Sequence, residues 1–198
     1  HQGVDYLAVA FADEGVLLRE RGITMPVVVL NADADSFDAM AANRLEPEIY
    51  SLRSLHEFAA AVERYGEQRY PIHVKLDTGM HRLGFVEEEL PALLDALARC
   101  GRTVRVASVF AHLCTSDDPA QDDFTRLQIA RFERMSSRIA EALPYPVLRH
   151  TANSAAIERF PEAQYDMCRL GLGLYGFGFE HNAALRPVST LRTRIVQI

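Results

Sequence analysis

Short runs of β-branched and apolar residues alternate with stretches of helical periodicity along most of the chain, and this alternation constrains the fold more than any other feature. Between the runs, apolar residues recur three or four positions apart, as on one face of a helix. Strands separated by helices in this way predict parallel βα units. Seven runs have the character of strands, and they cover residues 5–10, 26–31, 48–52, 72–77, 106–113, 147–153 and 167–175.

Helix signals fall between these runs, as the alternation requires. After the third run, Ser54 with Glu57 predicts a capping box at the start of a helix that Gly66 ends. Two further helices are predicted in the intervals 90–101 and 119–144, where apolar residues share one face. The chain is therefore expected to be α/β throughout most of its length.

Seven strands suit neither of the two common parallel folds without adjustment. An open doubly wound sheet could hold them, but no glycine-rich phosphate fingerprint follows the first run. A (β/α)8 barrel needs eight strands and typically about 250 residues, whereas this chain has 198. Since His1-Gln2-Gly3 has the pattern of a helix end that leads directly into a strand, we predict a (β/α)8 TIM-type barrel over residues 1–183 that lacks its first βα unit.

The last residues break the pattern of the barrel. Residues 191–198 alternate between polar and apolar side chains, as in a half-exposed strand, and no helical stretch precedes them. We therefore expect residues 184–198 to be the beginning of a C-terminal β domain.

Composition excludes several classes of function. The 27 acidic and 21 basic residues give a net charge of −6, which disfavours a nucleic-acid partner. No membrane span is expected, because no run of 18 uncharged apolar residues occurs, and no secretory leader is recognisable. The three cysteines lack paired spacing, which indicates reduced thiols in the cytoplasm. Lys75 is the only lysine, so any amine chemistry of this chain alone must use it.

Polar side chains gather where the predicted strands end, which is the functional face of a parallel barrel. Lys75 lies on the fourth run beside Asp77, and a structural ion pair between the two is one interpretation. Arg82 follows in a glycine-flanked turn, where a plain surface arginine is an alternative. His112 ends the fifth run and could be a hydrogen-bonded core histidine. No third ligand at metal spacing accompanies His112 and His150, so no metal is expected.

The last two predicted strands correspond to strands 7 and 8 of a complete barrel, where this fold commonly binds phosphate. Asn153 or Ser154 is the predicted N-cap of a helix over residues 155–159, whose first N–H groups would face an anion. Gly171 would let the backbone approach that anion closely. A simple helix cap and a tight turn remain the alternatives for these positions.

Three motifs together carry a resemblance to a known family. They are Asp-Thr-Gly-Met-His-Arg-Leu-Gly at 77–84, His-Thr-Ala-Asn-Ser-Ala-Ala at 150–156 and Arg-Leu-Gly-Leu-Gly-Leu-Tyr-Gly at 169–176. In this order they resemble the motifs of alanine racemases, which are pyridoxal-phosphate enzymes with a barrel domain and a C-terminal β domain. The resemblance extends over essentially the whole chain.

The resemblance implies pyridoxal 5'-phosphate as the cofactor and assigns residues to its two ends. Ser154 and the backbone amides of Gly171 and Leu172 would hold the phosphate. Arg169 would face the pyridine nitrogen, and because a guanidinium stays protonated, it would donate a hydrogen bond without handing over a proton. His112 and Asn153 would support the ring and Arg169.

The resemblance also implies how the substrate is held. Arg82 would bind the phenolic oxygen of the cofactor and the carboxylate of the substrate. Lys75 matches a position that is carbamylated in many members, and the resulting anion would orient Arg82.

By this resemblance the protein would interconvert L-alanine and D-alanine, supplying D-alanine for peptidoglycan, as a cytoplasmic homodimer that acts on a small amino acid. The two catalytic bases of the family are a Schiff-base lysine on the first barrel strand and a tyrosine from the partner subunit, and neither position exists in this chain. The chain alone is therefore expected to be inactive. Two alternatives stay open: a related pyridoxal-phosphate enzyme, such as a serine or broad-specificity racemase or an amino-acid decarboxylase, and a non-catalytic barrel that binds the cofactor.

Overall fold

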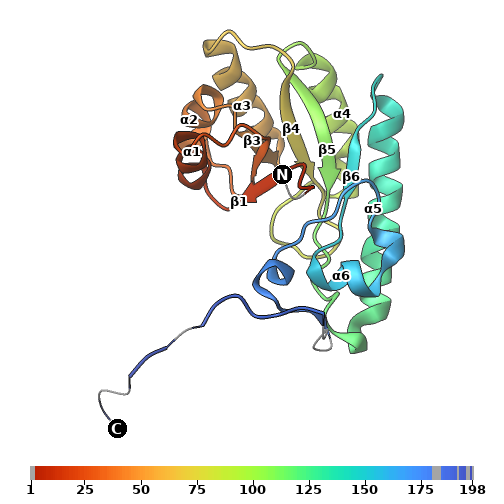
Figure 1. Ribbon diagram of the computed structural model, residues 1–198. Coiled ribbons are helices and arrows are strands. Elements are labelled where there is room, and N and C mark those ends of the chain that lie inside the picture. The colour runs from red at the N-terminus through yellow and green to blue at the C-terminus, as the bar shows by residue number, and fades with distance from the viewer. Residues whose placement is uncertain (1–2, 180–183, 191, 195–196, 198) are drawn as a thin grey trace.

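A parallel six-stranded sheet forms the centre of the molecule in the computed structural model, which describes residues 3–179, 184–190, 192–194 and 197. Each strand pairs in parallel with the next one along the chain, so the spatial order is β1-β2-β3-β4-β5-β6. The sheet curls, and helices cover its outer side (Figure 1). The strands are β1 Leu7–Val9, β2 Val27–Val29, β3 Glu46–Ile49, β4 Tyr70–Lys75, β5 Val104–Phe110 and β6 Leu148–His150.

The strand order distinguishes the two parallel folds that the sequence allowed. A doubly wound sheet reverses its strand order at a switch point, whereas this order never reverses. The structure therefore confirms a partial (β/α)8 barrel. In the described part of the chain the barrel is open, since β1 pairs only with β2 and β6 only with β5.

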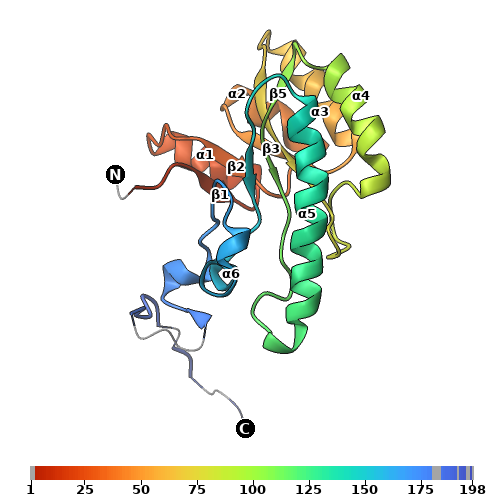
Figure 2. The ribbon, with the colours of Figure 1, turned by 90° about the vertical axis from the view of Figure 1, so that its right-hand side faces the viewer.

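Helices connect the strands, and short 3-10 turns precede several of them. Figure 2 shows α4 and α5 side by side on the outer side of the sheet. The helices are α1 Ala12–Glu20, α2 Phe37–Ala42, α3 Leu52–Arg64, α4 Leu90–Arg99, α5 Asp122–Ala142 and α6 Ser154–Arg159. The 3-10 turns are Ala34–Ser36, Glu87–Glu89, Pro119–Gln121, Pro161–Ala163 and Leu172–Tyr175.

The helix α3 shows how the apolar pattern forms the core. Leu55, Phe58 and Val62 are fully buried on its inner face, as the helical spacing predicts. The predicted cap is wrong by one turn, however. Ser51 caps the helix, because its hydroxyl accepts a hydrogen bond from the Ser54 N–H at 3.1 Å.

The predicted seventh strand at 167–175 is wrong. The backbone there makes one hydrogen bond to the segment that follows β6, from Arg169 N–H to the Ala152 carbonyl at 2.9 Å, and then forms the 3-10 turn Leu172–Tyr175. The apolar side chains that suggested a strand are exposed, since Leu170, Leu172 and Leu174 are 50–69% accessible. Apolar spacing alone therefore overstated the regularity of this segment.

Both predicted chain ends fall partly outside the described residues. His1 and Gln2 of the predicted helix end are not described, and neither are residues 191, 195, 196 and 198 of the predicted last strand. Residues 192–194 are described and lie in no strand. The domain boundary after residue 183 stays a prediction. Within the described chain, no helix combines the length and the apolar character that crossing a membrane requires.

Candidate active site

A cavity of 980 Å³ opens at the carboxyl ends of the strands, where parallel barrels carry their active sites. Residues from the ends of β1 through β5 contribute to its wall, together with the segments after β6. All eight residues that the sequence analysis singled out as site residues line this one cavity: Lys75, Arg82, His112, Asn153, Ser154, Arg169, Gly171 and Leu172. The structure therefore brings them together, while the role of each remains a prediction.

Lys75 lies at the end of β4 and is almost completely buried. Its partner is not Asp77, as the sequence suggested, but Glu48 on β3, whose Oε1 lies 3.8 Å from Lys75 Nζ. The Asp77 carboxylate instead accepts hydrogen bonds from the N–H groups of Gly79 and His81. Asp77 therefore shapes the turn after β4 and does not pair with Lys75.

That turn carries Arg82 to the rim of the cavity. It closes back on β4, because Phe85 N–H donates to the Lys75 carbonyl and Asp77 N–H to the Phe85 carbonyl, both at 2.9 Å. Gly84 makes this return possible: its φ is +130°, and a Cβ there would lie 2.6 Å from the Asp77 nitrogen. Only glycine fits such a position, so the turn geometry that places Arg82 depends on it.

Arg169 follows β6 and is held by four acceptors. Its Nη2 donates to the carbonyls of Ala111 and Thr151 at 2.8 and 3.1 Å. Its Nη1 lies 2.6 Å from His150 Nδ1 and 3.3 Å from the His150 carbonyl. Burial lowers the pKa of Arg169 to about 10, so the guanidinium stays protonated at neutral pH. His150 thus supports Arg169 together with the carbonyl groups of Ala111 and Thr151. The support for Arg169 that the resemblance implies from His112 and Asn153 stays a prediction.

His150 continues into a buried chain of hydrogen bonds that crosses four strands. Ser108 Oγ on β5 lies 2.9 Å from His150 Nε2 and 2.6 Å from His73 Nδ1 on β4. His73 Nε2 in turn lies 2.7 Å from Glu46 Oε2 on β3. Because a guanidinium can only donate, His150 accepts from Arg169 at Nδ1 and donates from Nε2 to Ser108 Oγ, so the His150 ring is neutral. Because a carboxylate can only accept, His73 donates from Nε2 to Glu46.

Of the residues in this chain of hydrogen bonds, Arg169 and His150 stand out in the sequence, whereas Ser108, His73 and Glu46 do not. Burial lowers the pKa of His150 well below its ordinary value, which agrees with the neutral ring that the hydrogen bonds require. One signal was available in the sequence: Glu46 and Glu48 stand two residues apart, and so do His73 and Lys75. Charged residues at that spacing face one side of a strand, here the inside of the barrel.

His112 forms another part of the cavity wall. Burial lowers its pKa to about 4, with further lowering by the charges of Arg169, Lys75 and Arg82. The imidazole is therefore neutral at physiological pH. It can contact a ring or accept a hydrogen bond, but it adds no positive charge to the site.

Ser154 and the segment after Arg169 form a further part of the cavity wall. The Ser154 hydroxyl accepts hydrogen bonds from the N–H groups of Gly171 and Gly173 at 3.0 and 3.1 Å. Asn153 is the N-cap of α6, since its Oδ1 accepts from Ala156 N–H at 3.0 Å. A Cβ added to Gly171 would meet nothing within 4 Å, so the glycine faces open space there rather than a packed turn.

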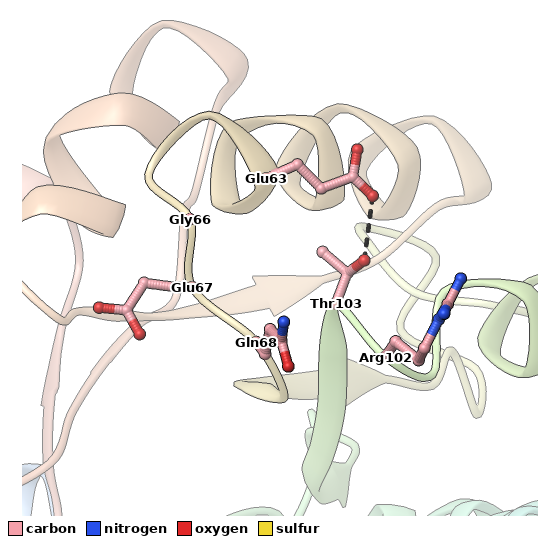
Figure 3. A pocket seen from close by; sticks show the side chains of 6 residues that line it. All are labelled: Glu63, Gly66, Glu67, Gln68, Arg102 and Thr103. Atoms are coloured by element: carbon pink, nitrogen blue, oxygen red, sulfur yellow. Dashed lines mark hydrogen bonds between the residues drawn. The ribbon is translucent and has the colours of Figure 1, made fainter.

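A second hollow, of 280 Å³, lies at the amino ends of β4 and β5 (Figure 3). Its polar lining includes Glu63, which accepts a hydrogen bond from Thr103 Oγ1 at 3.0 Å. Residues at this end of a parallel barrel serve stability rather than chemistry. Among the described residues, no three metal-binding side chains come together in either hollow or elsewhere.

A partial parallel barrel, with a cavity at the carboxyl ends of its strands that several charged side chains help to line, defines a TIM-type barrel of the kind that carries enzyme active sites. The comparison with known families is more specific. Residues 1–178 match the family model described as "Alanine racemase, N-terminal domain", and the chain belongs to this family.

Individual relatives agree with this assignment. An alanine racemase of Symbiobacterium thermophilum is 37% identical over 201 residues, which cover 98% of this chain and 52% of that protein. The solved structure of the Clostridium difficile alanine racemase in complex with cycloserine has a TM-score of 0.83 at 29% identity, covering 94% of this chain and 52% of that one. The chain spans about half the length of the relatives it matches.

A more distant structure shows the fold alone. The alanine racemase of Bartonella henselae, solved with covalently bound pyridoxal phosphate, has a TM-score of 0.77 at 21% identity, and the match covers 91% of this chain and 51% of that one.

Proposed function

We propose that the protein of which these residues are part interconverts L-alanine and D-alanine with pyridoxal 5'-phosphate as its cofactor. The observation that carries the proposal is the match of residues 1–178 to the alanine racemase N-terminal domain, combined with one cavity that all eight predicted site residues line. A supply of D-alanine for peptidoglycan, a cytoplasmic location and a homodimer belong to the same proposal.

The residues of the cavity fit the proposed cofactor at both of its ends. Ser154 offers a hydroxyl, and Leu172 a backbone amide, beside the open space at Gly171, which suits a phosphate. The Gly171 N–H donates to Ser154 in this structure, so it would have to exchange that hydroxyl for the phosphate. Arg169 offers a fixed, protonated guanidinium for the pyridine nitrogen. When bound, pyridoxal phosphate acidifies the Cα proton of an amino acid by withdrawing electrons.

The chain of hydrogen bonds behind Arg169 explains how this residue would moderate that chemistry. Arg169 can donate a hydrogen bond but does not transfer its proton. The neutral His150 accepts a hydrogen bond from Arg169, and the Glu46 carboxylate at the far end of the chain of hydrogen bonds stabilises the positive charge of the guanidinium. Arg169 is thereby kept as a fixed donor, which favours racemisation over reactions that need a stronger electron sink.

The charges of the cavity favour an anionic substrate group. Three basic residues, Lys75, Arg82 and Arg169, line it against two acidic ones, Glu48 and Asp117, whereas His112 is neutral. Arg82, exposed at the rim, would bind the carboxylate of alanine and the phenolic oxygen of the cofactor. Asn153 and His112 would complete the wall around the ring.

Racemisation needs a base on each face of Cα. By the resemblance, the Schiff-base lysine and the second-base tyrosine have no counterpart in these 198 residues, where Lys75 is the only lysine. We therefore expect the 198-residue chain by itself not to racemise alanine.

The test is the natural-length protein, purified and supplied with pyridoxal phosphate. It is expected to show an absorption band of the cofactor bound as an imine and to convert L-alanine into D-alanine, with alanine preferred over serine and with no release of CO2 from lysine. Preference for serine, or decarboxylation, would replace the proposal by a related barrel enzyme. Cofactor binding without any turnover would indicate a non-catalytic barrel.

A further inference from the structure

The helix α5 contacts both of the segments that carry Arg82 and His112 to the cavity. Gln128 lies at the centre of this contact. Its side chain is fully buried, and it does not itself line the cavity. Because burying a primary amide is costly unless its polar atoms have partners, the partners of Gln128 show what the residue does.

The amide of Gln128 holds the backbone just after β5. Its Nε2 donates to the His112 carbonyl at 3.2 Å, and its Oε1 accepts from the Cys114 N–H at 3.1 Å. A carbonyl can only accept and a backbone N–H can only donate, so these two bonds fix the orientation of the amide. Gln128 therefore pairs with the backbone here in the manner of a neighbouring strand.

The same amide also holds the turn after β4. Gln128 Nε2 donates to Thr78 Oγ1 at 3.3 Å, and Thr78 is buried. Arg131 lies three residues further along α5, on the same face of the helix, and its Nη1 donates to the Thr78 carbonyl at 3.1 Å. The helix thus holds Thr78 by its side chain and by its backbone. Arg82 follows four residues later in this turn and lines the cavity.

We propose that Gln128 is a positioning residue of this site: its amide fixes the turn that carries Arg82 relative to the backbone that carries His112. Two observations carry this inference, the hydrogen bonds from one buried amide to both segments and the second attachment of the turn to α5 through Arg131. The consequence for substrate binding, through Arg82, rests on the proposed function. The coupling of the two segments does not.

Hydrogen exchange of the purified natural-length protein, followed by mass spectrometry, tests the link to the turn. Thr78→Val keeps the shape of the side chain and removes the hydroxyl that accepts from Gln128, so exchange in residues 77–85 is expected to become at least about tenfold faster. Thr78→Ser keeps a hydroxyl and is expected to exchange like the wild-type protein. Thr125→Val is the matched control, because it removes a buried hydroxyl of α5 that bonds to Thr115 and not to the turn; it is expected to leave exchange in residues 77–85 unchanged.

A substitution of Gln128 itself tests the coupling of both segments. Gln128→Met keeps the length of the side chain and removes its hydrogen bonds to the turn and to the backbone after β5. Exchange in residues 77–85 and 111–114 is expected to become faster together. Faster exchange in only one of the two segments would contradict the coupling.

Enzyme kinetics separate positioning from a general loss of structure. Under the proposed function, Thr78→Val is expected to raise KM for alanine about tenfold and to change kcat less than about threefold, because Arg82 would hold the substrate carboxylate less well. A lower kcat at unchanged KM would indicate a loss of folded enzyme and would contradict the positioning of Arg82.

Two results of the exchange experiment would overturn the proposal. One is a Thr78→Val variant in which exchange in residues 77–85 is unchanged. The other is an equal rise in Thr78→Val and Thr125→Val, which would show general destabilisation in place of a specific link. The Thr78 variants decide these points even where Gln128→Met does not fold. Because exchange does not depend on turnover, the proposal can fail in a protein that racemises alanine and can hold in one that does not.

Discussion

Replacement of Ser108 by alanine removes the central link of the chain that runs from Arg169 to Glu46. Ser108 is fully buried, and its hydroxyl is the partner of His73 Nδ1 at 2.6 Å and of His150 Nε2 at 2.9 Å. Without it, two buried ring nitrogens lose a hydrogen bond. Each such loss costs about 1–3 kcal/mol, so the free energy of unfolding is expected to fall by about 2–6 kcal/mol.

Urea unfolding followed by circular dichroism measures this loss as a lower midpoint with an unchanged slope. Ser137→Ala is the matched control, because the Ser137 hydroxyl also makes two side-chain hydrogen bonds, but neither is fully buried: it donates to Glu133 at an exposed site and accepts from Arg149 Nη1 at 3.4 Å. Its effect is expected to stay within about 0.5 kcal/mol. If Ser108→Ala is as mild as Ser137→Ala, the hydrogen bonds do not form a connected buried chain and the reasoning is refuted.

Three other predictions follow from the site. His112 has a folded pKa of about 4, below its unfolded value of 6.5, so the unfolded state binds more protons in this range and the protein loses stability as pH falls from 6.5 to 4. His112→Gln is expected to remove up to about 3 kcal/mol of this pH dependence, measured by urea unfolding across that range, whereas the exposed His56→Gln is expected to leave it unchanged. Gly84→Ala would place a Cβ against backbone at φ +130°, so it is expected to lower the free energy of unfolding by at least about 2 kcal/mol. The control Gly66→Ala, at φ +69° in open space, is expected to lower it by only about 1 kcal/mol. Equal losses of stability in thermal unfolding would contradict the steric account. Ser154→Ala is expected to weaken pyridoxal-phosphate binding about tenfold in an absorbance titration, and an unchanged affinity would exclude Ser154 from the phosphate site.

The sequence was sufficient for most of the fold because hydrophobic periodicity is a local signal. Each of the six strands overlaps one of the predicted runs, although β3, β4 and β5 begin two residues earlier than predicted, and the amphipathic faces of α3 and α4 are buried as their spacing predicts. The seventh run failed because residues 167–175 have the apolar composition of a strand, whereas residues 172–175 form a 3-10 turn. The hydrogen bonds between β-strands depend on tertiary contacts, which the apolar pattern of one segment does not contain.

The cavity could be predicted because parallel strands converge at one edge, so residues at their carboxyl ends meet whatever their distance in sequence. The side chains with which those residues pair could not be predicted. Lys75 was assigned to Asp77 from its own strand, whereas the structure pairs it with Glu48 from the neighbouring strand. The support of Arg169 by His150, Ser108 and His73 likewise crosses strands. Register between strands decides such pairs, and a single sequence does not reveal it.

The most direct test of the account is a crystal structure of the natural-length protein with pyridoxal phosphate. The account predicts the phosphate against Ser154 and Gly171, the ring nitrogen against Arg169, and His150 still bonded to the far side of that guanidinium. A cofactor bound elsewhere in the cavity, with Arg169 directed away from its ring, would contradict it.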